Sequence, residues 1–488
     1  MPFLAGKRPA KDVRLARLLQ LYVMALLLFI AGCAGTSTFV PYPYKINPMI
    51  DGIKIGKPID FTRCLLSECQ GNDLILYKME RGRLAQILGA TEVSMADFSD
   101  SISSMREKEL KATISASDLG GEAAAVTLND NAIPYRGEGY ERVLLHHFQA
   151  MNYLAKGDLD GAGVETRRAN AEQEEALKQH ELELEQAQRE AEERQVGNYP
   201  GSRAISRRYA QLDEVAGKVK NSFQNAYTFY LSGFVYELAG QQNDAYIDYK
   251  KALEIFPENL TLQRDVLRLA RKLEMRQELE ELQSRFEPKE QPDAAGQPED
   301  AGELLVLFED GFAPQKQEVK IPFPLPEAGV VAIAFPMYAP RWAAPKPLAL
   351  RKGELSLGCT EAICDIRALA VKSLQEKAQA LALRQTLRAI AKGASVKLAE
   401  EKLGPLGSLG ANIWNLASEN ADLRSWLTLP ETAQIMRVSL PAGRHSLTLS
   451  YDQPSISANV DLEIKQGGKT LLRVVRTGAQ MYSSVSAF

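Results

Sequence analysis

The chain has 488 residues, of which 45% are hydrophobic and 25% charged, and its formal net charge is −4. These fractions are ordinary for globular proteins, so they exclude disorder throughout the chain. Because 58 basic residues nearly balance 62 acidic ones, the charge argues against an electrostatic nucleic-acid binder. At roughly 150 residues per domain, the length indicates more than one core and about three domains.

The first 32 residues have the pattern of a secretory signal. Five basic residues precede an apolar stretch from Leu18 to Gly32. Its 15 residues are fewer than the roughly 20 that a membrane span needs. The stretch ends in Ala31-Gly32-Cys33, small residues before a cysteine, which resembles the lipobox of bacterial lipoproteins. By that resemblance residues 1–32 are a lipoprotein signal peptide, and Cys33 becomes the lipidated first residue.

Lipidation at Cys33 implies a stable anchor, because each buried methylene of an acyl chain contributes about 0.8 kcal/mol. Ala34 follows the cysteine, where an aspartate would signal inner-membrane retention. The resemblance therefore implies the outer membrane of a bacterial cell envelope, with the body in the periplasm. An uncleaved signal anchor with Cys33 incidental is the alternative. Without residues 1–32 the chain carries 53 basic and 61 acidic groups, a net charge of −8, so we expect lipid rather than charge to make the attachment.

The remaining cysteines form two C-x4-C pairs, Cys64 with Cys69 and Cys359 with Cys364. In an oxidising periplasm, a local disulfide within each pair is the simplest of the three possible pairings. Four thiolates would also suit zinc, but the spacing fits zinc poorly. We therefore predict two local disulfides, and no metal or other cofactor.

Residues 33–60 are predicted to form an extended tether, because their prolines, among them Pro41, Pro43 and Pro48, do not allow a regular helix. Residues 61–286 follow it and are overwhelmingly helical in period. An inserted segment at about 171–222 has a charge-rich first half and an amphipathic second half. We expect an antiparallel helical hairpin there, either solvated or acting as a partner-binding arm.

Internal repeats are the most informative feature of this helical region. The segment from Ala226 to Asn259 resembles a tetratricopeptide repeat, a helix-turn-helix of about 34 residues. Six residues match its signature positions in phase: Gly233, Tyr236, Ala245, Tyr249, Ala252 and Pro257. A second unit matches at four positions: Ala150, Tyr153, Ala162 and Ala169. A weaker third unit around Gly82 gives the roughly three repeats that a solenoid needs, and Leu260–Phe286 is expected to be a capping helix.

A linker at residues 287–302 leads to a β-rich domain at 303–488. Eight segments have the β-branched and aromatic content of strands: 303–308, 318–323, 329–335, 348–357, 435–440, 445–450, 457–464 and 470–476. Residues 368–425 between them are predicted to be helical. The expected fold class is therefore α+β, with an N-terminal TPR-like α-helical solenoid that contains the inserted hairpin, and a C-terminal β-sandwich-like domain with a helical insertion.

Three stretches carry a family resemblance: 129–143 (NDNAIPYRGEGYERV), 152–169 (NYLAKGDLDGAGVETRRA) and 421–430 (ADLRSWLTLP). They resemble a family of uncharacterised bacterial lipoproteins with tetratricopeptide-like repeats. Such proteins are similar in order too, with a lipobox, helical repeats and a β-rich part. The resemblance implies a role in envelope assembly or around peptidoglycan, and no catalytic activity is established for the family.

Enzyme signatures such as H-E-x-x-H and G-x-S-x-G do not occur in the sequence, and we predict no catalytic residue. Asp130, Glu138 and Glu141 could supply paired carboxylates for glycan cleavage. Loop carboxylates beside a helix start, however, more often cap the helix. His146 and His147 have no metal-ligating residue four positions away, so we expect them to pack within the helices.

Binding is the function class that the sequence favours. In tetratricopeptide arrays the first helix of each repeat lines a concave groove. The matching positions are mostly aromatic or apolar: Tyr227, Tyr230, Phe234, Glu237, His147 and Met151. Such a surface can hold a peptide, unless a neighbouring helix covers it. We expect a lipid-anchored scaffold or adaptor, not an enzyme, that binds other envelope proteins or lipoproteins. A peptidoglycan-related enzyme, or an activator of an envelope enzyme, is the alternative.

Overall fold

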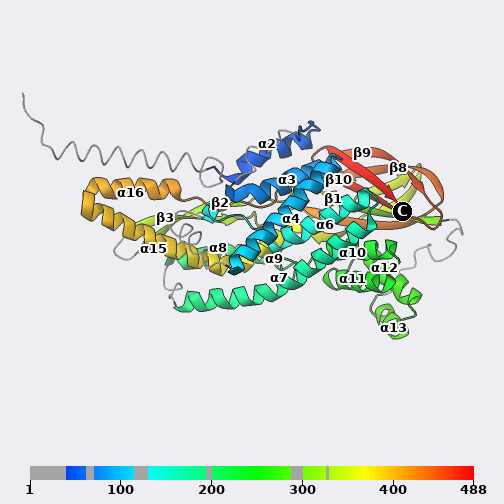
Figure 1. The fold of residues 1–488 in the computed structure, drawn as a ribbon, viewed down its shortest axis with the longest axis horizontal. Helices are drawn as coiled ribbons and strands as arrows, with labels where there is room; N and C mark the ends of the chain where they lie inside the picture. Colours follow the sequence, from blue (N-terminus) through cyan, green and yellow to red (C-terminus); the bar gives the residue numbers. More distant parts are fainter. Residues whose placement is uncertain (1–39, 62–70, 115–129, 194–199, 287–300, 326–328) are drawn as a thin grey trace, which may run out of the picture.

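The computed structural model describes residues 40–61, 71–114, 130–193, 200–286, 301–325 and 329–488. The fold is mixed α+β, with several sheets. The molecule is elongated: a long helical hairpin extends from one end and most strands gather at the other (Figure 1). Cys33, Cys64 and Cys69 lie outside the described residues, so their predicted lipidation and disulfide stay predictions.

The helical region is built from antiparallel helix pairs. Four pairs follow one another: α3 (Leu74–Ile87) with α4 (Thr91–Ile114), α6 (Gly139–Ala155) with α7 (Leu159–Glu193), α10 (Ala226–Leu238) with α11 (Gln242–Ile255), and α12 (Leu260–Lys272) with α13 (Arg276–Arg285). Each pair turns over three residues, and the middle residue has positive φ: Gly89, Gly157, Gly240 and Glu274. The following N–H donates to the carbonyl five residues earlier, as Gln241 does to Tyr236 at 2.8 Å. This αL turn is a common helix C-terminus.

Small residues let these helices approach. A Cβ atom on Gly233 would lie 2.6 Å from the ring of Tyr249, and one on Gly82 would lie 2.7 Å from the ring of Phe98. The alanines predicted at repeat positions are buried: Ala150, Ala162, Ala169, Ala245 and Ala252. Tyr153, Tyr236 and Pro257 are half-buried. The fold thus contains the predicted helix pairs, whereas a tetratricopeptide solenoid is not confirmed.

The expected extended tether at 33–60 is wrong for its described part, because Tyr42–Lys54 forms helix α2. Proline is tolerated in the first turn, where no N–H is needed, and Pro43 lies there. Pro48 lies inside the helix, at a cost of about 3 kcal/mol. Four apolar residues at helical spacing are buried: Tyr42, Ile46, Ile50 and Ile53. Each contributes about 1.5–3 kcal/mol, which outweighs the proline.

The insertion at 171–222 does not form a separate hairpin. Helix α7 runs without a break to Glu193, and α8 (Pro200–Tyr209), η5 (Ala210–Leu212) and α9 (Asp213–Ala216) follow. Helix α8 packs on α15 (Ala378–Leu403) and on β2 (Gln317–Leu325) rather than on α7. The single capping helix expected at Leu260–Phe286 is instead the α12–α13 pair.

All eight predicted strand segments contain strands. The strands are β1 (Ala301–Asp310), β2, β3 (Gly329–Met337), β4 (Ala349–Lys352), β5 (Leu355–Cys359), β6 (Glu361–Asp365), β7 (Thr432–Pro441), β8 (Gly443–Asp452), β9 (Ser455–Ile464), β10 (Lys469–Thr477) and β11 (Gln480–Ala487). Neither β6 nor β11 was predicted. The helices expected at 368–425 are α14 (Ile366–Glu376), α15 and α16 (Pro405–Ser418), and an irregular segment, 419–431, leads from α16 to β7.

Three sheets make the described β region. A five-stranded sheet has the order β11-β10-β1-β7-β6, in which only β1 and β10 are parallel. A four-stranded sheet has the order β5-β4-β8-β9, and β2 and β3 form a separate pair. Side chains alternate between the faces of a strand. On β1, Leu304, Val306 and Phe308 pack toward the four-stranded sheet, whereas Leu305 and Leu307 join the core of the helical region.

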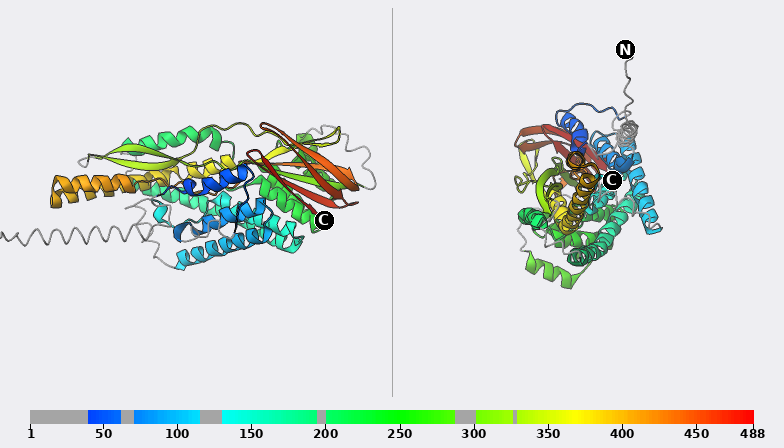
Figure 2. Two further views of the ribbon diagram at one scale, coloured as in Figure 1. Left: turned by 90° about the horizontal axis from the view of Figure 1, so that it is seen from above. Right: turned by 90° about the vertical axis from the view of Figure 1, so that its left-hand side faces the viewer.

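The five-stranded sheet is therefore the middle of three layers, between the helix pairs and the four-stranded sheet (Figure 2). The two predicted domains share one core, in which residues from α2 to α13 and from β1, β7 and β10 are in contact.

Candidate functional site

The predicted peptide groove is not open. Its six residues are buried: Tyr227, Tyr230, Phe234, Glu237, His147 and Met151. The five-stranded sheet and the C-terminal residue cover them, and the ring of Phe234 lies edge-on to the ring of Phe488 at 6.4 Å. The prediction of an exposed groove is wrong because the chain's own sheet occupies that side of the helices.

A buried ion cluster joins this face of the helices to the sheet. Glu309 on β1 accepts two hydrogen bonds from Arg473 on β10, at 2.9 and 3.0 Å, and one from the hydroxyl of Tyr227 at 3.0 Å. Arg83 on α3 also donates to Glu309. Its guanidinium stacks 4.1 Å from the ring of Phe148. All four polar groups are buried, so each charge depends on its partners.

A second cluster lies further along the same interface. Glu237 on α10 and Asp265 on α12 both bind Arg437 of β7, at 2.5 and 3.0 Å. The hydroxyl of Tyr230 donates to Asp265 at 2.7 Å, and Lys469 of β10 lies 3.2 Å from Glu237. Burial raises the pKa of Glu237, but the positive charges of Arg437, Arg268 and Lys469 outweigh burial and hold that pKa at about 2. The cluster is therefore ionised and holds helices to strands.

The adjacent histidines have different environments. The ring of His147 lies 4.2 Å from the ring of Tyr227, and neither of its nitrogens has a hydrogen-bond partner among the described residues. Burial, and secondarily Arg83, lower the pKa of His147 to about 3, so its ring is neutral. Nδ1 of His146 lies 2.6 Å from a carboxylate oxygen of Glu165 on α7. Both rings lie within the packed helices, as predicted.

Two buried carboxylates of the helical region bind the backbone of the 419–431 segment. Glu80 of α3 accepts hydrogen bonds from the N–H groups of Leu427 and Thr428, at 2.7 and 2.9 Å. Glu141 of α6 accepts one from the N–H of Trp426 at 2.8 Å. Trp426 is fully buried. Glu141 and Trp426, from two stretches far apart in the sequence, thus meet here, and their contact holds the segment to the helices.

The three candidate glycan-cleaving carboxylates are engaged in such contacts. Asp130 pairs with Arg388 at 2.9 Å. Glu138 accepts a hydrogen bond from Ser373 at 2.8 Å and pairs with Lys377 at 2.5 Å. Burial raises the pKa of Glu138, but Lys377 and Lys316 outweigh burial and hold it at about 2. At that pKa Glu138 cannot hold the proton that a general acid needs.

A polar cavity of about 340 Å³ lies between the 130–138 loop, α14 and α15. Five basic residues and three acidic ones line it: Arg136, Lys316, Lys377, Arg384, Arg424, Asp130, Glu138 and Asp422. Arg424 donates to Asp73 at 3.0 Å and to the carbonyl of Ile133 at 2.9 Å. Because these charges pair with one another and with the backbone, the cavity belongs to the packing contact between the 130–138 loop, α14, α15 and the 419–431 segment.

A larger cleft of about 490 Å³, which we call the junction cleft, lies between the end of α11, the 217–226 loop, β6 and α14. Apolar residues form much of its lining: Val219, Ala226, Ile255, Phe256, Pro257, Ala362, Ile363 and Leu369. Lys218, Lys220 and Asn221 also line it, and the two lysines are exposed. Thr432 lines it as well, and its buried hydroxyl has no hydrogen-bond partner among the described residues.

Cys364 lies in the lining of this cleft. It is a free buried thiol, and Cys359 is a free exposed one, so the predicted disulfide between them is not formed. Burial raises the pKa of Cys364 well above its usual range, which keeps it protonated and weakly nucleophilic. Within the described ranges, no group of three His, Cys, Asp or Glu side chains could hold a metal ion.

Strand β6 gives the junction cleft a further property. It is an edge strand of the five-stranded sheet, and residues 362–365 line the cleft. Asn259, the N-cap of α12, donates to the carbonyl of Ala362 at 2.9 Å. An edge strand that lines an apolar cleft can recognise an extended peptide by strand addition.

Sequence reasoning missed both the buried clusters and the junction cleft. A charged residue inside an apolar strand, such as Glu309 or Arg473, is the one available signal for a buried ion pair. The cleft had no such signal, because it is assembled from segments far apart in the sequence.

Comparison of the chain with protein-family models, with curated proteins and with solved structures finds no match in any of the three. In the described part of the chain, no helix is long and apolar enough to cross a membrane. The proposed function therefore rests on the geometry of the described residues.

Proposed function

We propose that the protein is a non-enzymatic scaffold or adaptor, anchored by a lipid on Cys33 to the outer membrane and facing the periplasm, that binds an extended segment of another envelope protein. The junction cleft carries this proposal, since it is open, largely apolar and bordered by the edge strand β6. The TPR-like helix pairs then serve as a frame, because the chain's own sheet fills the face where such arrays bind peptides. A peptidoglycan-related enzyme lacks comparable support, since Glu138 and Asp130 are engaged in ion pairs.

A pulldown from solubilised envelopes tests the cleft. Ile255 lines the junction cleft, whereas Ile247 lies about two turns earlier on the same helix, outside the lining of the cleft, with 49% of its surface exposed. We expect Ile255→Asp to recover roughly ten-fold less partner than the unchanged protein, and Ile247→Asp to recover as much. Equal recovery by both variants, with circular dichroism showing both folded, would contradict the cleft as the binding site.

A variant at the rim of the junction cleft tests the same site without a substitution in the core. Lys218 and Lys220 are exposed, so Lys218→Glu with Lys220→Glu leaves the core intact. We expect this double variant to weaken partner recovery less than Ile255→Asp does, because rim charges contribute mainly to association rate. Glycan cleavage by the purified protein, with no partner recovered, would instead favour an enzyme.

The anchor has its own test. Cys33→Ser removes the lipidated thiol, and we expect the variant to leave the membrane fraction for the soluble periplasm, since the acyl chains supply most of the membrane affinity. A Cys359→Ser variant is the matched control, because Cys359 is an exposed free thiol in the body of the protein. If the Cys33→Ser protein fractionates with membranes as completely as the unchanged protein, the lipid is not the anchor.

A further inference from the structure

The α15–α16 hairpin exposes apolar side chains that the fold does not use. Its most exposed members are Leu403, Leu406, Leu409 and Ile413, with 68%, 81%, 56% and 61% of their surface accessible. Together with Ile390 and Leu398 they are six of the sixteen exposed large hydrophobic residues among the described ones. Single exposed apolar residues are normal on a protein surface, but a contiguous group marks an interaction site.

The hairpin is fixed to the body of the protein at its base and presents these side chains at its tip. At its base, Lys392 pairs with the buried Glu419, and Arg388 with Asp130 at 2.9 Å. Among its described side chains beyond Gly393, only Gly407 is buried. Gly407 allows the close turn, because a Cβ atom there would lie 2.2 Å from the carbonyl oxygen of Ala399. The tip is thus held out from the body, as Figure 2 also shows.

The chemistry of α16 suits a bilayer. No charged residue occurs from Pro405 to Ser418, and Leu406, Leu409 and Ile413 share one helix face by their spacing. At 1.5 Å per residue, α16 is about 21 Å long, too short to span the hydrocarbon core but long enough to lie in the interface. A helix without charged residues offers a protein partner no ion pair to fix its register, whereas a lipid surface needs none.

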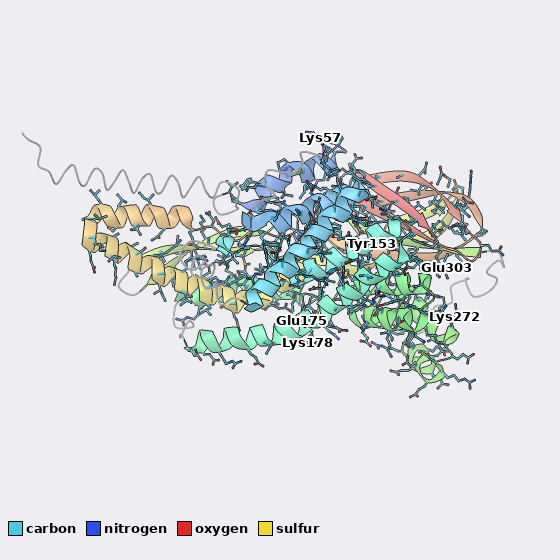
Figure 3. The ribbon with its side chains drawn as sticks, in the orientation of Figure 1. Lys57, Tyr153, Glu175, Lys178, Lys272 and Glu303 are labelled. Carbon is cyan, nitrogen blue, oxygen red and sulfur yellow. The ribbon has the colours of Figure 1, made fainter. Side chains whose placement is uncertain are left out.

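Helix α2 is the described helix that follows the predicted anchor, and its first residues lie toward the hairpin. Lys57, just beyond α2, lies on the side of α2 away from the hairpin (Figure 3), so α2 begins on the hairpin side. Val40 and Tyr44, at its start, are 48% and 73% exposed. Cys33 precedes Val40 by seven residues, a reach of at most about 25 Å. A lipid on Cys33 would therefore hold the bilayer on the hairpin side of α2.

We propose that the tip of the α15–α16 hairpin inserts Leu403, Leu406, Leu409 and Ile413 into the interface of the bilayer, as a second membrane contact beside the lipid. The orientation rests on the proposed function, because the Cys33 anchor supplies the proximity. The affinity of the tip for lipid is a separate property of its exposed leucines. A membrane contact at this end points the β-rich end away from the bilayer.

Fluorescence quenching by lipid tests this contact. The full lipidated protein is reconstituted into phosphatidylethanolamine–phosphatidylglycerol vesicles that contain spin-labelled lipid, with a genetically encoded environment-sensitive fluorescent amino acid in place of Leu406. The matched control carries it in place of Leu355, which is 63% exposed on the β4–β5 hairpin. We expect roughly five-fold more quenching at position 406 than at position 355, since an interfacial helix buries its apolar face several ångströms deep.

Two readouts keep the tip and the anchor apart. Flotation of the protein with the vesicles reports the anchor, and quenching at position 406 reports the tip. Equal quenching at positions 406 and 355 overturns the tip proposal, whether or not the protein floats. A blue shift at 406 without quenching by lipid also overturns it, because a second copy or another protein then covers the tip. Because the lipid on Cys33 anchors the protein, the double variant Leu406→Ser with Leu409→Ser should still float with the vesicles.

Discussion

The inner face of the helix pairs and the tip of the α15–α16 hairpin are both rich in large apolar side chains, yet they end in opposite environments. Tyr230 and Phe234 on the inner face have 0% and 1% of their surface exposed, whereas Leu406 at the tip has 81%. The sequence pattern of the inner face resembles a peptide-binding array, and the chain itself supplies what covers it. Apolar helix positions therefore show where something binds, but not whether the chain fills the site itself.

Polar residues mark the difference between the two regions. The covered face includes Glu237, Tyr227 and Arg83, each matched by a charge on the sheet. The hairpin tip has no charged residue along α16. A face with buried ion pairs fits one partner in one register, because an unmatched charge is costly there. A helix without charged residues, such as α16, has no such requirement and suits a fluid surface.

The largest expected effect comes from breaking the covered region. Trp426 is fully buried, with ring contacts to Phe98 and Phe148 at 5.8 and 5.9 Å. We expect Trp426→Ala to lower the free energy of unfolding by about 3–5 kcal/mol in urea titrations, because a large cavity remains. At the tip, Leu406→Ala should change it by less than about 0.5 kcal/mol. Similar losses from both substitutions would show that the two regions do not differ in packing.

The second expected effect depends on pH. His147 is neutral in the folded protein, with a pKa of about 3, whereas an unfolded histidine titrates near 6.5. Between these values the unfolded state binds more protons, so the stability that comes from His147 is complete above about pH 6.5 and falls as the pH is lowered. From pH 7.5 to 5 the loss is about 2 kcal/mol.

Replacing His147 by a side chain that does not titrate should remove this loss. In His147→Phe the free energy of unfolding at pH 5 and at pH 7.5 should therefore differ by about 2 kcal/mol less than in the unchanged protein. Urea unfolding at both pH values gives the comparison, and the other titrating groups are common to the two proteins. An unchanged pH dependence would show that His147 is accessible to protons in the fold.

The smallest expected effect concerns the fourth helix pair. Glu274 has a φ of 56° in the position that glycine occupies in the other three turns. We expect Glu274→Gly to raise the free energy of unfolding by about 1 kcal/mol, because glycine adopts this conformation without strain. Glu280→Gly, inside α13, is the matched control and should lower it by about 1 kcal/mol. A loss of stability in both variants would contradict the turn geometry.

Much of the fold could be predicted where local signals decide it. Turn glycines such as Gly157 and Gly240, and small residues such as Gly233, identify helix pairs because neighbouring residues make those contacts. The fourth pair escaped prediction because Glu274 replaces the glycine. Helix α2 escaped because Pro48 suggested an extended chain, while the burial that stabilises α2 involves distant residues.

The candidate sites were harder to predict, for the same reason. The groove was predicted from positions along single helices, but whether it is open depends on β1, β7 and β10, which lie far along the chain. Glu309 contacts Arg83, 226 residues away, and no local pattern links them. The exposed leucines of α16, by contrast, were visible in the sequence but had the same periodicity as a packed helix.

The five-stranded sheet is seated on the inner face of the helices, and a double-mutant cycle between Arg83 and Glu309 tests this packing most directly. Arg83→Met, Glu309→Gln and the double variant give a coupling free energy from urea unfolding. We predict a coupling of about 2–3 kcal/mol, because both charges are buried together. The surface pair Lys78–Asp100, at 2.5 Å with Asp100 59% exposed, should give less than about 0.5 kcal/mol. If the coupling between Arg83 and Glu309 is no larger than that of the surface pair, the inner face is not closed by the sheet.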